Sequence, residues 1–254
     1  MTGDRTFPAA AGTANCSIGS TAVAPVPPKG RIRAAQGAHA QLEELIRWCL
    51  GLEYISESSK DRIKTGNHYQ SVRLGDTTTS GFRSDRTCFL EKINFDSKTV
   101  LDLGSNLGEL SRAARTRGAS LVDGFEYDPF FVEVAQLLNV YNSTTRVSFF
   151  ERDITVEASY DGRYDIVMAF SVWTYVAPML GAIGRITDVF LLETHNLLGN
   201  LEKDYIDRLG DVFPRHITLG ESDWGKSQDP SGRRAVVLCA KSDTALEQAL
   251  ETPS

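Results

Sequence analysis

The chain has 254 residues, of which 41% are hydrophobic and 24% are charged, and its formal net charge is −6. This composition suits one globular domain with appended segments, and the lack of an apolar run of about 18 residues predicts no membrane-spanning helix. The acidic balance disfavours a nucleic-acid partner, and four cysteines without metal-ligand spacing favour reduced thiols in a cytoplasmic protein without a metal site.

The first part of the chain is expected to lie outside the main domain. Residues 1–30 are rich in Ala, Gly, Ser, Thr and Pro, which predicts a disordered leader. We interpret residues 31–95 as a helical cap segment that contributes to a substrate pocket. Apolar residues at helical spacing predict a helix over 34–51, and these are Leu42, Leu45, Ile46 and Cys49.

Strands and helices then alternate through residues 96–242, which we expect to form the main domain. The predicted strands are 99–103, 120–125, 146–150, 164–170 and 188–193, and the predicted helices are 108–117, 129–141, 178–185 and 200–212. Two last runs, 215–219 and 234–241, have no helix between them and predict an antiparallel hairpin, before a flexible tail over 243–254. The pattern predicts an α/β, Rossmann-like, doubly wound and mostly parallel seven-stranded sheet.

A glycine-rich loop, DLGSNLG, follows the first strand of this domain. Gly104 and Gly108 allow the backbone to turn sharply and to approach a ligand closely. A dinucleotide loop has the pattern G-x-G-x-x-G, which places helix amides against a pyrophosphate. Here Asp102 precedes the first glycine, and a carboxylate there suits an ammonium group better than a pyrophosphate.

Acidic residues also end the next two strands. Glu126 is placed to accept hydrogen bonds from ribose hydroxyls, as acids at the end of a second strand do. Asp153 is able to accept from an adenine amino group, and Ile154 offers an apolar face to the ring. Asp128, by contrast, precedes Pro129 and is equally suited to cap the following helix.

Taken together, the DLGSNLG loop, Glu126, Asp153-Ile154 and the strand YDIVMAFSV resemble the class I S-adenosylmethionine (SAM) methyltransferases. The resemblance covers about residues 99–241 and implies that SAM is the cofactor. The SAM-binding residues that we expect from the resemblance and from the neighbouring sequence are Arg83, Asp102, Gly104, Ser105, Gly108, Glu126, Tyr127, Asp153, Ile154, Phe170 and Ser171.

The preceding segment, HYQSVRLGDTTTSGFRSD, is similar to a segment of the tRNA wobble-uridine methyl- and carboxymethyltransferase group. Gln70 stands where that group has His, and Ser80 where it has Pro. We therefore take this narrower resemblance as informative about fold and cofactor more than about substrate. Arg83 in this segment either pairs with the methionine carboxylate of SAM or is a surface arginine paired with Asp85 or Asp76.

These patterns predict an enzyme that transfers a methyl group to oxygen or nitrogen of a small-molecule acceptor, natural-product or sugar-like. The alternatives are a tRNA wobble-uridine methyl- or carboxymethyltransferase and a SAM-binding protein without catalysis. The candidate catalytic residues are His195 as general base, Glu193 and Tyr175. Trp173 and Tyr175 either wall the acceptor pocket or belong to the core. We expect a monomer or a homodimer.

Overall fold

The protein is described by a computed structural model over residues 29–53, 69–79, 81, 83–194, 207–223 and 233–250. Its contacts divide the chain into two units, residues 1–37 and 38–254. Helix α1 (Lys29–Glu53) begins in the first unit, and every contact described below lies in the second. The predicted base His195 lies outside the described residues, as do residues 1–28 of the predicted leader 1–30 and most of the predicted helix 200–212, whereas residues 29 and 30 begin α1.

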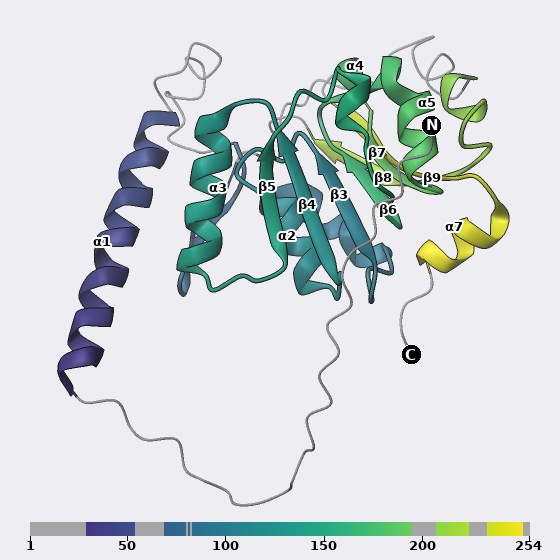
Figure 1. The fold of residues 1–254 in the computed structure, drawn as a ribbon. Helices are drawn as coiled ribbons and strands as arrows, with labels where there is room; N and C mark the ends of the chain where they lie inside the picture. The colour runs from purple at the N-terminus through teal and green to yellow at the C-terminus, as the bar shows by residue number, and fades with distance from the viewer. Residues whose placement is uncertain are drawn as a thin grey trace, which may run out of the picture. The chain divides into compact units, whose positions relative to one another are not determined.

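The second unit is built around a seven-stranded sheet with the order β5-β4-β3-β6-β7-β9-β8 (Figure 1). The first five strands in this order run parallel, and β9 pairs antiparallel with both β7 and β8. The predicted Rossmann-like sheet and its C-terminal hairpin are therefore confirmed. The strands are β3 (Thr99–Leu103), β4 (Leu121–Glu126), β5 (Val147–Glu151), β6 (Ile166–Ala169), β7 (Val189–Glu193), β8 (Arg215–Asp223) and β9 (Arg233–Ala240).

The two faces of the sheet bury separate sets of apolar side chains, because successive residues of a strand point to opposite faces. Val100 of β3 packs in a cluster with residues of α2 (Glu109–Thr116), α3 (Pro129–Tyr141) and α7 (Asp243–Leu250). Its neighbour Leu101 packs in the opposite cluster, with residues of α4 (Trp173–Val176) and α5 (Leu180–Ile186). The strands are thus covered on both sides, as the sequence predicts for a parallel sheet.

Several short elements complete the fold. A hairpin of β1 (Val72–Leu74) and β2 (Thr77–Thr79) precedes the long 3₁₀ helix η2 (Ser84–Lys92). Short 3₁₀ turns η3 (Glu157–Ser159) and η4 (Ala177–Met179) flank the later strands. Phe89 and Leu90 of η2 are buried in the same cluster as Val100, so the segment before the main domain is part of its core.

Residues 243–250 form helix α7, where the sequence predicts a flexible tail. Ala249 is buried, and Ala245, Leu246 and Leu250 pack against the core. The Ala249 carbonyl also accepts a hydrogen bond from the Asn94 amide at 2.8 Å. The four apolar side chains make one helical face, which the polar composition of the segment obscures. Among the described residues, no helix has the length and apolarity needed to cross a membrane.

Candidate active site

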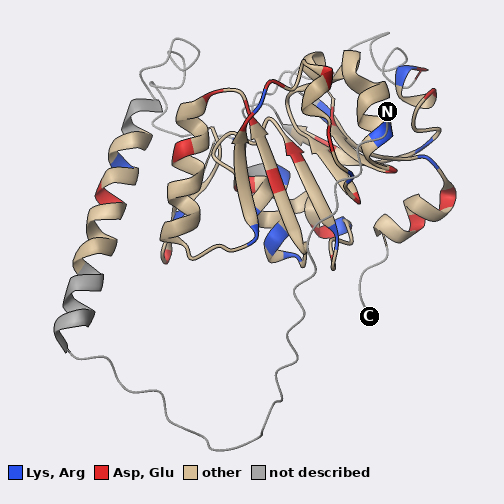
Figure 2. Ribbon diagram, viewed as in Figure 1, with Lys and Arg blue, Asp and Glu red and all other residues tan. Residues whose placement is uncertain are grey.

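A pocket of about 510 Å³ opens where the parallel strands end. Ligands of open α/β sheets bind at this edge, outside the carboxyl ends of the strands. Acidic residues lie on the loops along the same edge (Figure 2). The pocket is lined by Tyr69, Gly104, Asn106, Glu126, Tyr127, Asp153, Ile154, Thr155, Phe170, Ser171, Val172 and Tyr175.

The pocket brings together predicted residues from the ends of four strands. Those in its lining are Gly104, Glu126, Tyr127, Asp153, Ile154, Phe170, Ser171 and Tyr175. The lining also contains four residues that were not predicted as SAM contacts, Tyr69, Asn106, Thr155 and Val172. The last three lie next to predicted residues in the chain, and Tyr69 belongs to the segment before η2.

The glycine loop is shaped by steric limits at two positions. Gly104 has a φ of 73°, and a Cβ there would lie 2.5 Å from Cγ1 of Val172. Gly108, at the start of α2, has a φ of 78°, and a Cβ there would lie 2.2 Å from Cζ of Phe149. Both positions therefore require glycine, for backbone conformation and for space.

Gln70 connects the segment before η2 to the glycine loop through hydrogen bonds of its side chain. Its amide Nε2 donates to the Ser105 carbonyl at 3.1 Å, and its Oε1 accepts from the Glu109 amide at 3.0 Å. The Ser71 amide in turn donates to Oε2 of Glu109 at 3.0 Å. Gln70 is 2% exposed, so these bonds are shielded from water. In the sequence, Gln70 stands out only as a departure from a related segment, so this role was not predicted.

Glu126 is the last residue of β4, and its carboxylate is held by three backbone amides. Oε2 accepts from Asn106 at 2.8 Å, and Oε1 accepts from Tyr127 at 2.9 Å and from Asp128 at 3.1 Å. Burial raises the pKa of Glu126, and these amide hydrogen bonds oppose the rise. The amides fix the carboxylate at the pocket wall. Asp128 caps α3 by accepting from the Phe130 amide at 2.9 Å, as the capping alternative predicted.

Asp153 follows β5 and is held by its own loop. Its Oδ1 accepts from the Thr155 hydroxyl at 2.6 Å and from the Thr155 amide at 2.9 Å. These two hydrogen bonds lower the pKa of Asp153, so it is ionised at neutral pH. Ile154 beside it is 7% exposed and contributes an apolar wall to the pocket.

Asp102 lies beneath the pocket and is absent from its lining. The carboxyl is 2% exposed and accepts a hydrogen bond from the Ser111 hydroxyl of α2 at 2.5 Å. Burial raises its pKa to about 6, against the effects of the Ser111 hydroxyl and the Arg86 charge. In this structure Asp102 therefore joins β3 to α2, and its predicted contact with an ammonium group stays a prediction.

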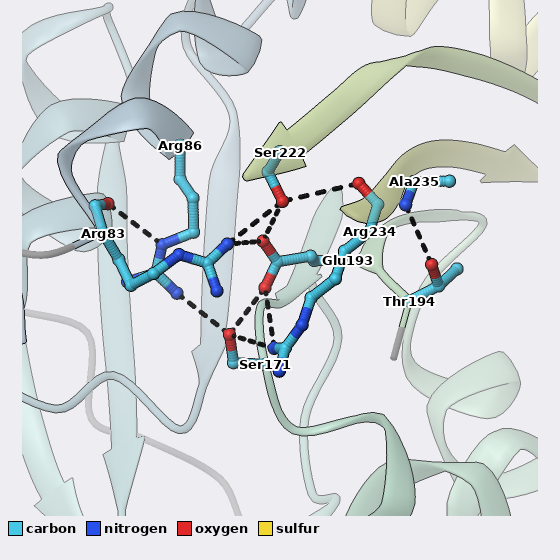
Figure 3. A network of polar contacts seen from close by, with 8 residues as sticks. All are labelled: Arg83, Arg86, Ser171, Glu193, Thr194, Ser222, Arg234 and Ala235. Carbon is cyan, nitrogen blue, oxygen red and sulfur yellow. Dashed lines mark hydrogen bonds and ion pairs between the residues drawn. The ribbon is translucent and has the colours of Figure 1, made fainter. Parts of the chain in front are cut away.

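Glu193 ends β7 at the centre of a buried polar network (Figure 3). Its Oε1 accepts from Nη2 of Arg83 and from the Ser222 hydroxyl, both at 2.5 Å. Its Oε2 accepts from the Ser171 hydroxyl at 2.6 Å and lies 3.6 Å from Nη1 of Arg234. Glu193 is fully buried, and both of its carboxylate oxygens are engaged by these partners.

The network keeps Glu193 ionised. Burial raises its pKa, but the charges of Arg86 and Arg83 and the hydroxyls of Ser171 and Ser222 bring it below the ordinary value. Arg83 is likewise fully buried, so it is not the surface arginine of one sequence alternative. Its ion pair with Glu193 was not predicted, because the partners are 110 positions apart in the chain.

The two aromatic residues after β6 separate into different roles. Trp173 is 5% exposed and belongs to the core cluster beneath α4, as one alternative predicted. Tyr175 is 55% exposed and lines the pocket, so its hydroxyl is available to a ligand. Ser171 between the strand and these aromatics has a φ of 62°, an uncommon conformation for a serine.

The fold and the pocket together define the Rossmann-like class of methyltransferases, and comparisons with known proteins agree. The family model of a methyltransferase domain matches residues 79–221, more than half of the chain, so the chain belongs to this family. The chain therefore carries a SAM-dependent methyltransferase domain, with SAM as the cofactor of that domain. The narrower tRNA wobble-uridine group is not identified by this match.

Three known proteins are similar to the chain, one in sequence and two in structure. The chain is 30% identical over 98 residues to nodulation protein NoeA of Rhizobium meliloti (strain 1021), covering 38% of this chain and 19% of NoeA. The bifunctional kinase-methyltransferase WbdD superposes with a TM-score of 0.53 and 16% identity, covering 71% of this chain and 46% of WbdD. The N-terminal domain of EvdMO1, crystallised with S-adenosylhomocysteine (SAH) and D-fucose present, gives a TM-score of 0.53 and 14% identity, covering 71% of this chain and 94% of that domain.

The chain spans about a fifth of the length of NoeA and less than half of that of WbdD. The likeness to the solved structures therefore supports the fold and leaves the acceptor to other arguments.

Proposed function

We propose that the enzyme transfers the methyl group of SAM to an oxygen or nitrogen atom of a small-molecule acceptor, natural-product or sugar-like. The observation that carries this proposal is the 510 Å³ pocket that joins the predicted SAM residues, Ser171 among them, to the candidate catalytic residue Tyr175. A pocket of this size is typical of small-ligand sites. In support, the related EvdMO1 domain was crystallised in the presence of SAH and a sugar.

The cofactor is expected along the ends of β3, β4 and β5. Two buried polar atoms of the glycine loop, Ser105 Oγ and Asn106 Oδ1, have no hydrogen-bond partner in the part of the chain that the structure describes. Buried polar groups are rarely left without a partner, so these atoms fit a bound ligand. We assign Glu126 to the ribose hydroxyls, and Asp153 with Ile154 to the adenine.

Methyl transfer needs little covalent assistance from the protein, because the sulfonium of SAM supplies both the methyl group and the leaving group. The chain's own task is to orient the acceptor and to exclude water. Tyr175 is placed to hydrogen-bond an acceptor at the pocket wall. Glu193 acts as a positioning residue, since its carboxylate fixes the Ser171 hydroxyl. His195 stays our candidate for a general base.

Calorimetry with SAH tests the cofactor half of this proposal. Replacing Glu126 by Gln leaves its shape but removes the charge that accepts from ribose hydroxyls, so we expect SAH affinity to fall about tenfold. Glu157→Gln, an exposed change in a pair with Arg185, is the matched control. Equal SAH affinity in Glu126→Gln and the native protein would contradict the ribose assignment.

Methyl-labelled SAM tests the acceptor half. Incubation with fractions of small metabolites and, separately, with total tRNA shows which class takes up the label. We expect label in the small-molecule fraction. The tRNA alternative rests on the segment around Gln70 and predicts label in tRNA, together with binding that weakens steeply as salt rises.

A further inference from the structure

Arg86 is a buried cation without an anionic partner among the residues that the structure describes. It is 1% exposed. Its Nε donates to the Arg83 carbonyl at 3.3 Å and its Nη1 to the Ser171 hydroxyl at 3.4 Å, both neutral acceptors and both at long distance. Its Nη2 is buried and has no hydrogen bond to any described residue. A buried guanidinium usually forms a short bond to a carboxylate or phosphate, so Arg86 lacks the partner that its chemistry requires.

The position of Arg86 connects it to the pocket. Its guanidinium carbon lies 5.1 Å from the ring centroid of Tyr69, and its Nη1 contacts Ser171, and both of these residues line the pocket. Arg234 reaches the same hydroxyl, with Nη1 at 3.0 Å from Ser171 Oγ. Figure 3 shows the two guanidinium groups approaching Ser171 from different elements. Two cations therefore meet at one residue of the pocket wall.

Three acidic residues lie near enough for the charge of Arg86 to act on them through space, namely Asp102, Glu109 and Glu193. Each is already engaged elsewhere by short hydrogen bonds, Asp102 with Ser111, Glu109 with Ser71 and Glu193 with Ser171 and Ser222. None of the three forms an ion pair with Arg86. These three nearby carboxylates explain why the protein tolerates a buried guanidinium at this position. Because each of them is bonded elsewhere, Nη2 of Arg86 stays available to a ligand.

We propose that Arg86 binds an anionic group, a carboxylate or a phosphate, carried by the methyl acceptor at the Ser171 end of the pocket. This inference rests on the proposed function and narrows its substrate class to acidic small molecules. The planar fork of arginine matches two oxygens of such a group and fixes its orientation. When Arg86 holds the anionic group at one end of the acceptor, the rest of the acceptor is oriented so that its nucleophile faces the methyl group.

The sheet order favours the acceptor over the cofactor as the source of the anion. The expected SAM contacts Gly104, Glu126 and Asp153 follow β3, β4 and β5. Arg234 lies on β9, which is separated from β3 by β6 and β7. The polar network that holds Ser171 therefore extends away from the adenosine half of the site. SAM itself also carries a carboxylate, and the experiment distinguishes the two sources.

The test compares ligand binding to the native protein and to Arg86→Gln. SAH and 5′-methylthioadenosine, which lacks the amino-acid carboxylate, are titrated first by calorimetry. Inorganic phosphate and acetate are then titrated into the SAH-saturated protein. Arg163→Gln is the matched control, because Arg163 is an exposed arginine paired with Asp188 away from the pocket. Thermal melts establish that each variant is folded.

We expect the SAH-saturated native protein to bind phosphate or acetate with a dissociation constant on the order of 1 mM, and Arg86→Gln to bind it at least about tenfold more weakly. SAH affinity should be the same in both. Arg163→Gln should resemble the native protein throughout. Arg86→Lys keeps the charge without the fork, and should bind the anion more weakly than the native protein.

Other results would overturn the proposal. Loss of SAH affinity in Arg86→Gln, with methylthioadenosine affinity unchanged, would assign Arg86 to the carboxylate of SAM. No anion binding to the SAH-saturated native protein, or equal anion binding by the native protein and Arg86→Gln, would leave Arg86 with a structural role only. Failure of the native protein to bind SAH would instead contradict the proposed function, and it would be seen before any anion is added.

Discussion

The two halves of the pocket are built in different ways. At the ends of β4 and β5, Glu126 and Asp153 are held by amides and a hydroxyl of nearby loops. At the ends of β6 and β7, Ser171 and Glu193 are held by side chains from distant elements, with Arg83 and Ser222 separated by 139 positions. Local backbone contacts suit a constant ligand such as the cofactor, whereas a network of side chains can change between related enzymes together with the acceptor.

We expect the largest effect on stability in the half of the pocket at the ends of β6 and β7, which is held by side chains. Glu193→Ala removes the carboxylate shared by Arg83 and Arg234 and leaves buried charge uncompensated, which typically costs about 3–5 kcal/mol of unfolding free energy. Urea unfolding measures this loss. Glu157→Ala, which breaks an exposed pair with Arg185, is the control and should change stability far less. Similar losses in the two variants would remove the distinction between the halves.

Asp102, beneath the half of the pocket expected to bind SAM, should make the stability of the protein depend on pH. Its folded pKa of about 6 lies above the ordinary value of 3.8, so the folded state holds this proton more tightly. The stability from this group is fully present below the ordinary pKa and is lost as the pH rises through about 6, by roughly 3 kcal/mol. Asp102→Asn lacks this titration. Urea unfolding should therefore show the variant gaining stability relative to the native protein from pH 4 to pH 7, and a constant difference would contradict the buried carboxyl.

The smallest expected effect concerns the backbone of the glycine loop. Gly104→Ala places a methyl group against Val172 at a positive φ, and we expect a loss of about 1–3 kcal/mol with weaker SAH binding. Gly181→Ala, on α5 with open space around its Cα, should instead stabilise the protein by about 0.5–1 kcal/mol. Unfolding curves and SAH calorimetry on both variants check this contrast. Unchanged SAH affinity in Gly104→Ala would separate the loop from the cofactor.

The two halves of the pocket also differ in how well they could be predicted from the sequence. The strands, the glycine loop, Glu126 and Asp153 were readable because hydrophobic periodicity and short spacings specify them within a few residues. The Glu193 network was not, because Arg83, Ser222 and Arg234 converge on the end of β7 only when the residue before η2 and the strands β8 and β9 have packed around it. Helix α7 was missed for a related reason, since its apolar face is recognised only against the core that it covers.

Ser171 both lines the pocket and forms hydrogen bonds with Glu193, Arg86 and Arg234. Its left-handed backbone costs about 1 kcal/mol that a glycine would avoid. Glycine would also remove the hydroxyl that joins three buried side chains. This position therefore limits how the enzyme can diverge: a lineage that acquires a new acceptor must either keep this serine or rebuild the whole network in one concerted series of substitutions.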